Sequence, residues 1–206
     1  MMTSTITYDF SYTGYALRIK EMSKIARFIL TDQSFDVVNE LGSGKTTTAQ
    51  RSLSEIKKRL DVLTEKQRII LLDGDLISQK QIVFLAICKL HYFMRDFTIE
   101  VLREKYLVFD VQFTEGEFIS FVRRKREIHQ NLDEKSDTAI YKIRKVTFQI
   151  LEEAGIIDSV KDKNIQPQIL DNQVIEAIVE DDPEWLKIFL MSDSDIIDSI
   201  KDKWKI

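Results

Sequence analysis

The stretch that most constrains this chain is residues 79–105, which holds the most apolar run of the sequence. From Ile82 to Cys88 every residue is apolar, and apolar side chains recur on nearly every side of a helix through this segment. Such a pattern is typical of a buried central helix. The run cannot cross a bilayer, because Lys89 interrupts it after seven residues and a span needs about 20. From Phe97 onward the apolar residues narrow to one stripe, which predicts a surface helix leaning on the first.

Turn-forming residues are scarce, with only 6 Gly and 2 Pro in 206 residues. This scarcity favours long helices over a β-sandwich. We therefore predict a mainly all-α fold, a helical bundle built around the 79–105 helix pair. The expected organisation is an N-terminal helical lobe over residues 1–75, followed by residues 76–206 with the central pair, a winged-helix region and acidic C-terminal helices. One continuous domain is the alternative.

Three segments carry a family resemblance in their order and spacing: TTTAQRSLSEIKKRL at 46–60, the string CKL, DF and EVLREK within 88–105, and TAIYKIRKVTFQILEEAGI at 138–156. Together they resemble the BrxA family of bacteriophage-exclusion (BREX) phage-defence systems. The resemblance spans roughly residues 10–160. None of the three segments is a catalytic motif, so the match rests on their order and spacing. The resemblance implies an all-helical, cytoplasmic, DNA-binding accessory protein with no known catalytic centre.

The net charge of −4 conceals an uneven distribution. Residues 42–68 hold seven basic residues against three acidic ones, whereas residues 158–206 hold six basic residues against twelve acidic ones. Such asymmetry suits a protein with one side that faces a polyanion and another that is turned away from it.

The first candidate surface is a basic helix predicted over residues 47–62, with Leu53, Ile56 and Leu60 at helical spacing on its inner side. Two interpretations have equal weight: a solvated basic face, or a surface that contacts phosphates. The candidate nucleic-acid-binding residues of this segment are Lys45, Thr46, Arg51, Lys57, Lys58 and Arg59.

The second candidate surface follows a capping box at residues 114–117, which starts a helix to about residue 128. Ser136 or Asp137 begins another helix, which ends at Gly155. Two short β-like runs around a charged turn then predict a short β-hairpin, with Pro167 confining its strand to an edge. The candidate nucleic-acid-binding residues here are Arg123, Arg124, Lys125, Arg126, Tyr141, Lys142, Arg144 and Lys145.

Helix, loop, helix and hairpin is the order of a winged helix-turn-helix, in which residues 137–154 would lie in the major groove of DNA. An ordinary helical hairpin with a surface β-loop is an equal alternative. The loop at residues 130–135 is longer than the turn of 3–4 residues typical of a tight helix-turn-helix.

Residues 42–46 read GSGKT, like the end of a phosphate-binding loop. The full motif needs a further glycine where this chain has Asn39, and a buried apolar strand before it. We favour the simpler interpretation, a helix that ends at Gly42 and a second helix that begins near Thr46 or Thr47. A nucleotide-binding switch remains the alternative that an ATP or GTP titration decides.

The sequence contains few patterns typical of catalytic or metal-binding sites. Neither His91 nor His129 stands in a His-x-x-x-His or His-x-Glu pattern, and adjacent carboxylate pairs on helix ends do not converge. The single cysteine, Cys88, excludes a disulfide framework and indicates a reducing compartment. The N-terminal residues lack the regions of a secretory signal. We therefore expect a cytoplasmic protein that is not an enzyme, with no cofactor, no metal, no membrane partner and no small-molecule substrate.

Two further segments have open interpretations. Aromatic residues at positions 8–15 predict an anchor for the N-terminus on the helical core, with base stacking as the alternative. Residues 192–206 predict an acidic amphipathic helix that docks on the body of the protein or on a partner. The function we expect is low-specificity binding of double-stranded DNA through phosphates, together with other BREX proteins. The alternative is a protein-interaction adaptor without nucleic-acid binding of its own.

Overall fold

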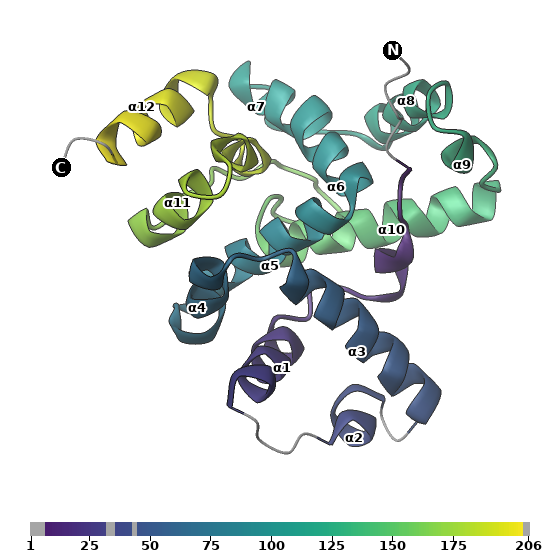
Figure 1. Cartoon of the computed structure of the whole chain (residues 1–206). Helices are drawn as coiled ribbons and strands as arrows, with labels where there is room; N and C mark the ends of the chain where they lie inside the picture. The colour runs from purple at the N-terminus through teal and green to yellow at the C-terminus, as the bar shows by residue number, and fades with distance from the viewer. Residues whose placement is uncertain (1–6, 32–35, 43–44, 204–206) are drawn as a thin grey trace, which may run out of the picture.

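The computed structural model describes residues 7–31, 36–42 and 45–203, and helices dominate it (Figure 1). Within these residues the β-structure is limited to two isolated bridges, which confirms the prediction of a mainly all-α fold. The elements are η1 Ser11–Gly14, α1 Ile19–Thr31, α2 Val37–Gly42, α3 Thr46–Asp61, α4 Glu65–Asp73, α5 Leu76–Leu90, α6 Tyr92–Phe97, η2 Thr98–Arg103, α7 Glu104–Leu107, α8 Glu115–Arg126, α9 Gln130–Asp133, α10 Asp137–Ala154, α11 Asn172–Val179, η3 Pro183–Phe189 and α12 Asp193–Lys203.

Helix α5 is the buried centre that the apolar run predicts. Every side chain from Gln81 to Cys88 is buried, and α5 contacts α1, α3, α4, α10, α11 and η3. Figure 1 shows it in the middle of the molecule. A single hydrophobic cluster includes residues from both sides of the 75/76 boundary, so the core is continuous across it.

The start of α5 depends on a tight turn. The Asp75 carboxylate caps the helix by accepting a hydrogen bond from the backbone N–H of Ser78 at 2.7 Å. A Cβ atom at Gly74 would lie 2.5 Å from the carbonyl oxygen of Ile70, so only glycine fits between α4 and α5. Helix α4 itself was not predicted from the sequence, although Thr64 and Gln67 form a capping box at its beginning.

Residues 8–17, which we call the N-terminal strap, run across the molecule between α3 and α10. Tyr8 and Tyr12 are buried, which confirms the aromatic anchor. The Tyr12 hydroxyl lies 3.0 Å from the hydroxyl of Thr147 on α10. The backbone N–H of Leu17 donates to the Glu153 carboxylate at 2.8 Å. The strap is therefore bound to α10 at two points along that helix.

A buried ionic cluster binds the strap to α3. Arg59 is 0 % exposed, and its Nε donates to Oε1 of Glu55 at 3.1 Å. Its Nη1 donates to the carbonyl oxygens of Ala16 and Leu17 at 3.1 and 3.3 Å. Nε2 of the buried His91 lies 3.0 Å from the same Glu55 oxygen. Arg59, Glu55 and His91 therefore hold α3, the strap and the end of α5 together.

The environment of Glu55 shifts its pKa in two opposing directions. Burial by itself would raise the pKa of this carboxyl group. The hydrogen bond with His91 and the positive charge of Arg59 outweigh burial and lower the pKa to about 2. The carboxylate is consequently charged in the folded protein at all ordinary pH values.

Helix α8 packs against α6 and η2 through aromatic side chains and one buried lysine. Six phenylalanines form a cluster of mostly edge-to-face contacts: Phe93, Phe97, Phe113, Phe118, Phe121 and Phe148. Beside it Nζ of Lys125 lies 2.5 Å from Oε1 of Glu100 and 3.2 Å from Oδ2 of Asp96. Lys125 therefore neutralises carboxylates at the edge of the aromatic core.

The acidic C-terminal helix docks on the body of the protein. Ile196 of α12 is buried and Ile200 packs against the core, whereas Ile197 is exposed. Arg103 binds the carboxylate of Asp193 at 2.9 Å and so fixes the beginning of α12. Trp204, which the sequence places near the same stripe, lies outside the described residues.

We expect Glu55→Gln to lower the free energy of unfolding by about 3 kcal/mol, because it leaves the buried guanidinium of Arg59 without a counter-charge. Asp61→Asn, which changes an exposed carboxylate on the same helix, is the matched control and should shift this free energy by less than about 0.5 kcal/mol. Urea unfolding followed by circular dichroism measures both. Equal effects of the two substitutions would contradict the buried ion pair.

The same carboxylate predicts a dependence of stability on pH. The pKa of Glu55 is about 2 in the folded protein, against an ordinary value of 4.5, so the unfolded chain binds this proton more tightly. The stabilisation that Glu55 contributes is therefore fully present above its ordinary pKa of 4.5. It is lost as the pH falls toward the pKa of about 2 in the folded protein. From about pH 5 to about pH 3 the wild type should lose more stability than Glu55→Gln. Parallel stability curves of the two proteins would rule out Glu55 as the source.

Lys125→Met should lower the free energy of unfolding by about 2 kcal/mol, because it removes the ammonium group shared by Asp96 and Glu100. Its neighbour Arg124 has a mostly exposed side chain that approaches Glu100 only to 3.9 Å. Arg124→Met should therefore change this free energy by less than about 0.5 kcal/mol. Thermal unfolding of both variants measures the difference. A larger loss of stability in Arg124→Met than in Lys125→Met would disprove the structural role given to Lys125.

Candidate nucleic-acid interface

Helix α10 has one buried face and one exposed basic stripe. It begins where the Ser136 hydroxyl accepts a hydrogen bond from Ala139 N–H at 3.3 Å, and it ends at Gly155 in the left-handed conformation, as the sequence predicts. Its inner face includes the buried residues Ile143, Phe148 and Leu151. The outer face exposes Thr138, Tyr141, Lys142 and Lys145, which recur at helical spacing along the first half of the helix.

Extended backbone segments lie beside this helix. Bridges join Ile157 to Ile165 and Gln112 to Asn164, so residues 163–166 lie between residues 156–158 and residues 111–113. The N–H of Gln166 donates to the carbonyl of Ile156 at 2.9 Å, and that of Phe113 donates to the carbonyl of Lys163 at 3.2 Å. The predicted hairpin is thus reduced to one bridge flanked by hydrogen bonds. The pairing with residues 111–113 was not predicted, although Val111, Gln112 and Phe113 alternate in polarity.

The connection between α8 and α10 contains a short helix that the sequence does not predict. Residues 130–135 were expected to form a loop, but α9 occupies Gln130–Asp133 within it. The capping box at Thr114 is confirmed, since its hydroxyl accepts from the N–H of Glu117 and the Glu117 carboxylate accepts from the N–H of Thr114. The order is therefore helix, short helix, helix, and then the bridged segments.

Helix α3 presents the other basic surface. Lys45 is the extended residue at its beginning, and the exposed candidates of this surface are Lys45, Thr46, Arg51, Lys57 and Lys58. Its buried face contains Ala49, Ile56 and Leu60. The candidates that the sequence placed here are therefore on the solvent side, with one exception.

Arg59 and Lys125 are corrections to the predicted set. Both are basic residues on predicted basic surfaces, but both are buried and their charges are bound by carboxylates of the same chain. A buried guanidinium cannot reach a phosphate without unfolding the cluster that neutralises it. These two residues therefore stabilise the fold and are removed from the candidate interface.

Three other predicted arginines are partly engaged within the chain. Arg144 forms an ion pair with Glu115, and Nη2 of Arg126 donates to the carbonyl of Lys135 at 3.0 Å. The guanidinium of Arg124 lies 3.9 Å from a Glu100 oxygen and is otherwise exposed. These side chains are therefore less available for a phosphate contact than the cations that form no ion pair.

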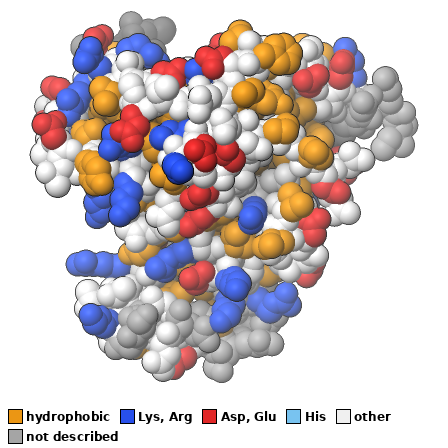
Figure 2. Space-filling model, turned by 180° about the vertical axis from the view of Figure 1, so that it is seen from behind, with side chains coloured by type: hydrophobic (Ala, Val, Ile, Leu, Met, Phe, Trp, Pro, Cys, Tyr) orange, Lys and Arg blue, Asp and Glu red, His pale blue; other side chains and the backbone are white. Residues whose placement is uncertain are grey.

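The remaining candidates form a set of exposed cations that make no ion pair within the part of the chain that the structure describes. We call this set the cationic flank; it consists of Lys45, Arg51, Lys57, Lys58, Arg123, Lys142 and Lys145. Figure 2 shows Lys and Arg side chains along the left edge and across the lower part of the molecule, on both sides of an indentation. Figure 1, which is seen from the opposite side, places α8–α10 at that edge and α1–α3 in the lower part.

The acidic C-terminal elements lie away from this flank. Figure 1 places α11 and α12 at the side opposite to α8 and α9. They take up nearby cations of their own: Lys66 binds Glu180 and Lys89 binds Asp181. The acidic C-terminal part of the sequence is therefore set apart from α8 and α9 in space.

The GSGKT segment has helices on both sides. Gly42 is the last residue of α2 and Thr46 the first of α3, whereas Ser43 and Gly44 lie outside the described residues. A phosphate-binding loop of the Walker type follows a β-strand, and residues 37–42 are helical. The observed order agrees with the interpretation as a turn between helices.

The two histidines have neighbours typical of packing residues. His91 belongs to the buried ionic cluster, and His129 stacks on the ring of Tyr8 with a centroid separation of 3.8 Å. Burial raises the pKa of the Cys88 thiol well above its ordinary value. Nowhere in the described ranges do three or more His, Cys, Asp or Glu residues form a cluster that could hold a metal ion. None of the described helices is long and apolar enough to span a bilayer.

Known structures support the fold. The chain is similar to the crystal structure of an uncharacterized protein from Magnetospirillum magneticum, with a TM-score of 0.76 and 18% sequence identity. The match covers 90% of this chain and 99% of that one. At this level of identity the likeness extends to the architecture alone.

Sequence comparisons identify the family. The BrxA family model matches residues 6–182. The BREX protein BrxA of Escherichia coli O9:H4 (strain HS) is 26% identical over 160 residues, which cover 74% of this chain and 75% of that protein. The BREX protein BrxA of Bacillus cereus (strain H3081.97) is 29% identical over 126 residues, which cover 61% of this chain and 63% of that protein. The chain therefore belongs to the BrxA family of bacteriophage-exclusion systems.

Proposed function

We propose that this protein is a non-catalytic, cytoplasmic accessory component of a BREX phage-defence system that binds double-stranded DNA through phosphates and acts with other BREX proteins. The observation that carries the proposal is the cationic flank. Its lysines and arginines are exposed and unpaired in the described part of the chain, while the buried cations are neutralised internally. Exposed cations without an ion pair favour contact with a polyanion even in a protein with a net negative charge.

The arrangement around α10 supports a winged helix-turn-helix interpretation. In that motif the second main helix lies in the major groove and a small antiparallel sheet follows it. Here α8, α9 and α10 are followed by two paired segments, and the segment before α8 pairs with the second of them. Tyr141, Lys142 and Lys145, in the first half of α10, would then face the groove, with the exposed Lys161 in the turn between the paired segments.

The exposed stripe of α10 supports low sequence specificity. Bidentate recognition of bases usually requires Arg, Asn or Gln aimed at their edges. Arg144 is bound to Glu115, and the Gln149 side chain donates to Glu153 at 2.9 Å. The exposed side chains of the stripe are lysines, a tyrosine and a threonine, which suit phosphates better than base edges.

Helix α3 would extend the contact to a second stretch of backbone. Arg51, Lys57 and Lys58 are exposed on it, and the N-terminal strap fixes its position relative to α10. A duplex that spans both helices would release counterions from each set of phosphates, so the affinity should fall steeply with salt.

The test is a salt titration of duplex binding, measured by fluorescence anisotropy for the wild type and two matched variants. The log–log slope should be about −0.9 per phosphate contacted. Lys142→Glu with Lys145→Glu should weaken binding at every salt concentration and make the slope shallower by about two. Lys66→Glu with Lys201→Glu carries the same charge change on exposed residues that pair with acidic partners, and it should leave the slope close to the wild-type value.

Three outcomes would contradict the proposal: no binding of duplex at low salt, binding that is insensitive to salt, or equal losses in the two double variants. Equal losses would mean that net charge alone governs the interaction. Single-stranded DNA and RNA in the same series establish whether the duplex is preferred.

A further inference from the structure

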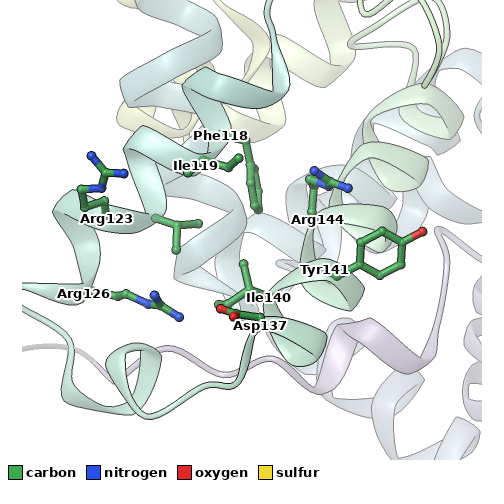
Figure 3. Close-up of a pocket in the computed structure, with 9 residues that line it drawn as sticks. Phe118, Ile119, Arg123, Arg126, Asp137, Ile140, Tyr141 and Arg144 are labelled. Atoms are coloured by element: carbon green, nitrogen blue, oxygen red, sulfur yellow. The ribbon is translucent and has the colours of Figure 1, made fainter.

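A pocket of about 310 Å³ lies between α8 and α10, and the proposed phosphate contacts give its apolar lining no role. Phe118 and Val122 are buried at its floor, and Ile119 and Ile140 line its walls. Figure 3 shows Phe118 and Ile140 directed into the space between the two helices, while Tyr141 points away from α8. Ile119 is 48 % exposed, which leaves an apolar wall open to solvent. An accessible apolar hollow of this kind favours a partner that can fill it.

Three guanidinium groups surround this apolar floor. Arg123 and Arg126 come from α8 and Arg144 from α10, and Asp137 is the one carboxylate among the residues that line the pocket. Arg144 has a partner in Glu115, while Arg123 makes no ion pair within the described ranges. The lining therefore carries an excess of positive charge, which an anionic group on the occupant would neutralise.

Arg126 has one hydrogen-bond donor, its Nε atom, without an acceptor among the described residues. One end of its guanidinium donates to the carbonyl of Lys135 at 3.0 Å, but its Nε atom is buried and has no hydrogen-bond partner among the described residues. In Figure 3 the side chain extends from α8 toward Asp137 and Ile140. A buried donor without an acceptor is uncommon and costly in folded proteins. A carboxylate brought by a ligand would satisfy it.

We propose that this pocket is the docking site for an acidic, amphipathic segment of a partner protein, which inserts an apolar side chain between α8 and α10 and pairs carboxylates with Arg123 and Arg126. The lining follows helical spacing on both walls: Ile119, Val122 and Arg126 on α8, and Asp137, Ile140 and Arg144 on α10. A groove between two helices with this lining matches the recognition of an amphipathic helix by its apolar face. The proposal does not rest on DNA binding.

The apolar floor decides between a peptide and a nucleic acid. Phosphates of a duplex would neutralise the arginines but would leave Ile119 and the floor uncovered. A base could cover them only after leaving the stack, which costs a few kcal/mol. A peptide supplies the apolar group and the carboxylate together without that cost. The chemistry of the lining therefore favours an acidic peptide.

The experiment is a display selection from a random dodecapeptide library on the full-length protein, with Ile119→Glu for counter-selection. Ile119 is half exposed on a helix, so the substitution keeps the fold while it places a negative charge on the wall of the pocket. Ile128→Glu is the matched control, because Ile128 is 58 % exposed beside the end of α8 and does not line the pocket. Circular dichroism verifies that both variants are folded.

The expected result is enrichment of sequences in which an apolar residue is flanked by Asp or Glu. The best synthetic peptide should shift the methyl resonances of Ile119, Val122 and Ile140 in the wild type. Its affinity should fall about tenfold or more in Ile119→Glu, a loss of at least ~1.4 kcal/mol, and should stay unchanged in Ile128→Glu. Duplex binding should persist in Ile119→Glu, because Arg123 is the one residue that this pocket shares with the cationic flank.

Several results would overturn the proposal. They are a selection that enriches nothing over the counter-target, enrichment of basic peptides, and an acidic peptide whose affinity is unaffected by Ile119→Glu. If mononucleotides or single-stranded DNA shift the same three methyl resonances while the acidic peptides do not, the pocket is a nucleic-acid site.

Discussion

The structure depends on a charge that is buried and must remain paired. The guanidinium of Arg59 has no access to solvent, so its contacts with Glu55 and with the carbonyl oxygens of Ala16 and Leu17 have to be made together. Breaking one partner of such a cluster leaves an uncompensated charge in the interior, which costs several kcal/mol. The N-terminal strap is therefore an integral layer of the fold, although it contains only one short helical turn, η1.

This constraint determines how the basic surfaces are placed. The ionic cluster binds the strap to α3 at one end, and Tyr12 and Leu17 bind it to α10 at Thr147 and Glu153. Two helices that lie about ninety positions apart in the sequence thus keep a fixed relation across the strap. Both helices carry exposed lysines or arginines, and the acidic α11 and α12 lie on the side of the molecule opposite to α8 and α9.

The pocket follows from the way α8 and α10 meet. Phe118 of α8 and Phe148 of α10 make an edge-to-face contact at 5.4 Å deep in the aromatic cluster. Toward the beginning of α10 the facing side chains are Arg126, Asp137 and Ile140, and there the two helices enclose the hollow. Of the three arginines that line the pocket, Arg144 forms an ion pair with Glu115. Arg123 and Arg126 form no ion pair within the described residues. A single pair of helices can therefore offer phosphate contacts on one face and a peptide site between them.

Local signals predicted the elements well. The unbroken apolar run identifies α5, the capping box at Thr114 identifies α8, and Ser136 with Gly155 delimits α10, because each of these features acts within a few residues. The burial of charged residues could not be predicted from such local signals. Glu55 and Arg59 have the spacing of an exposed pair on a helix surface, and only the strap, which is distant in sequence, makes the pair a core element. Lys125 was misplaced for the same reason, because Asp96 and Glu100 come from another helix.

The central claim is that α3 and α10 contact one duplex together, and cross-linking from each helix tests it most directly. A photoreactive benzophenone side chain can replace Lys58 or Lys145, with Ile197 on the exposed side of α12 as the negative position. A duplex just long enough to bind one molecule is irradiated with each protein at low salt. The account predicts efficient cross-links from positions 58 and 145 and none above background from position 197. Cross-links from only one of the two helices, or equal yields from all three positions, would contradict it.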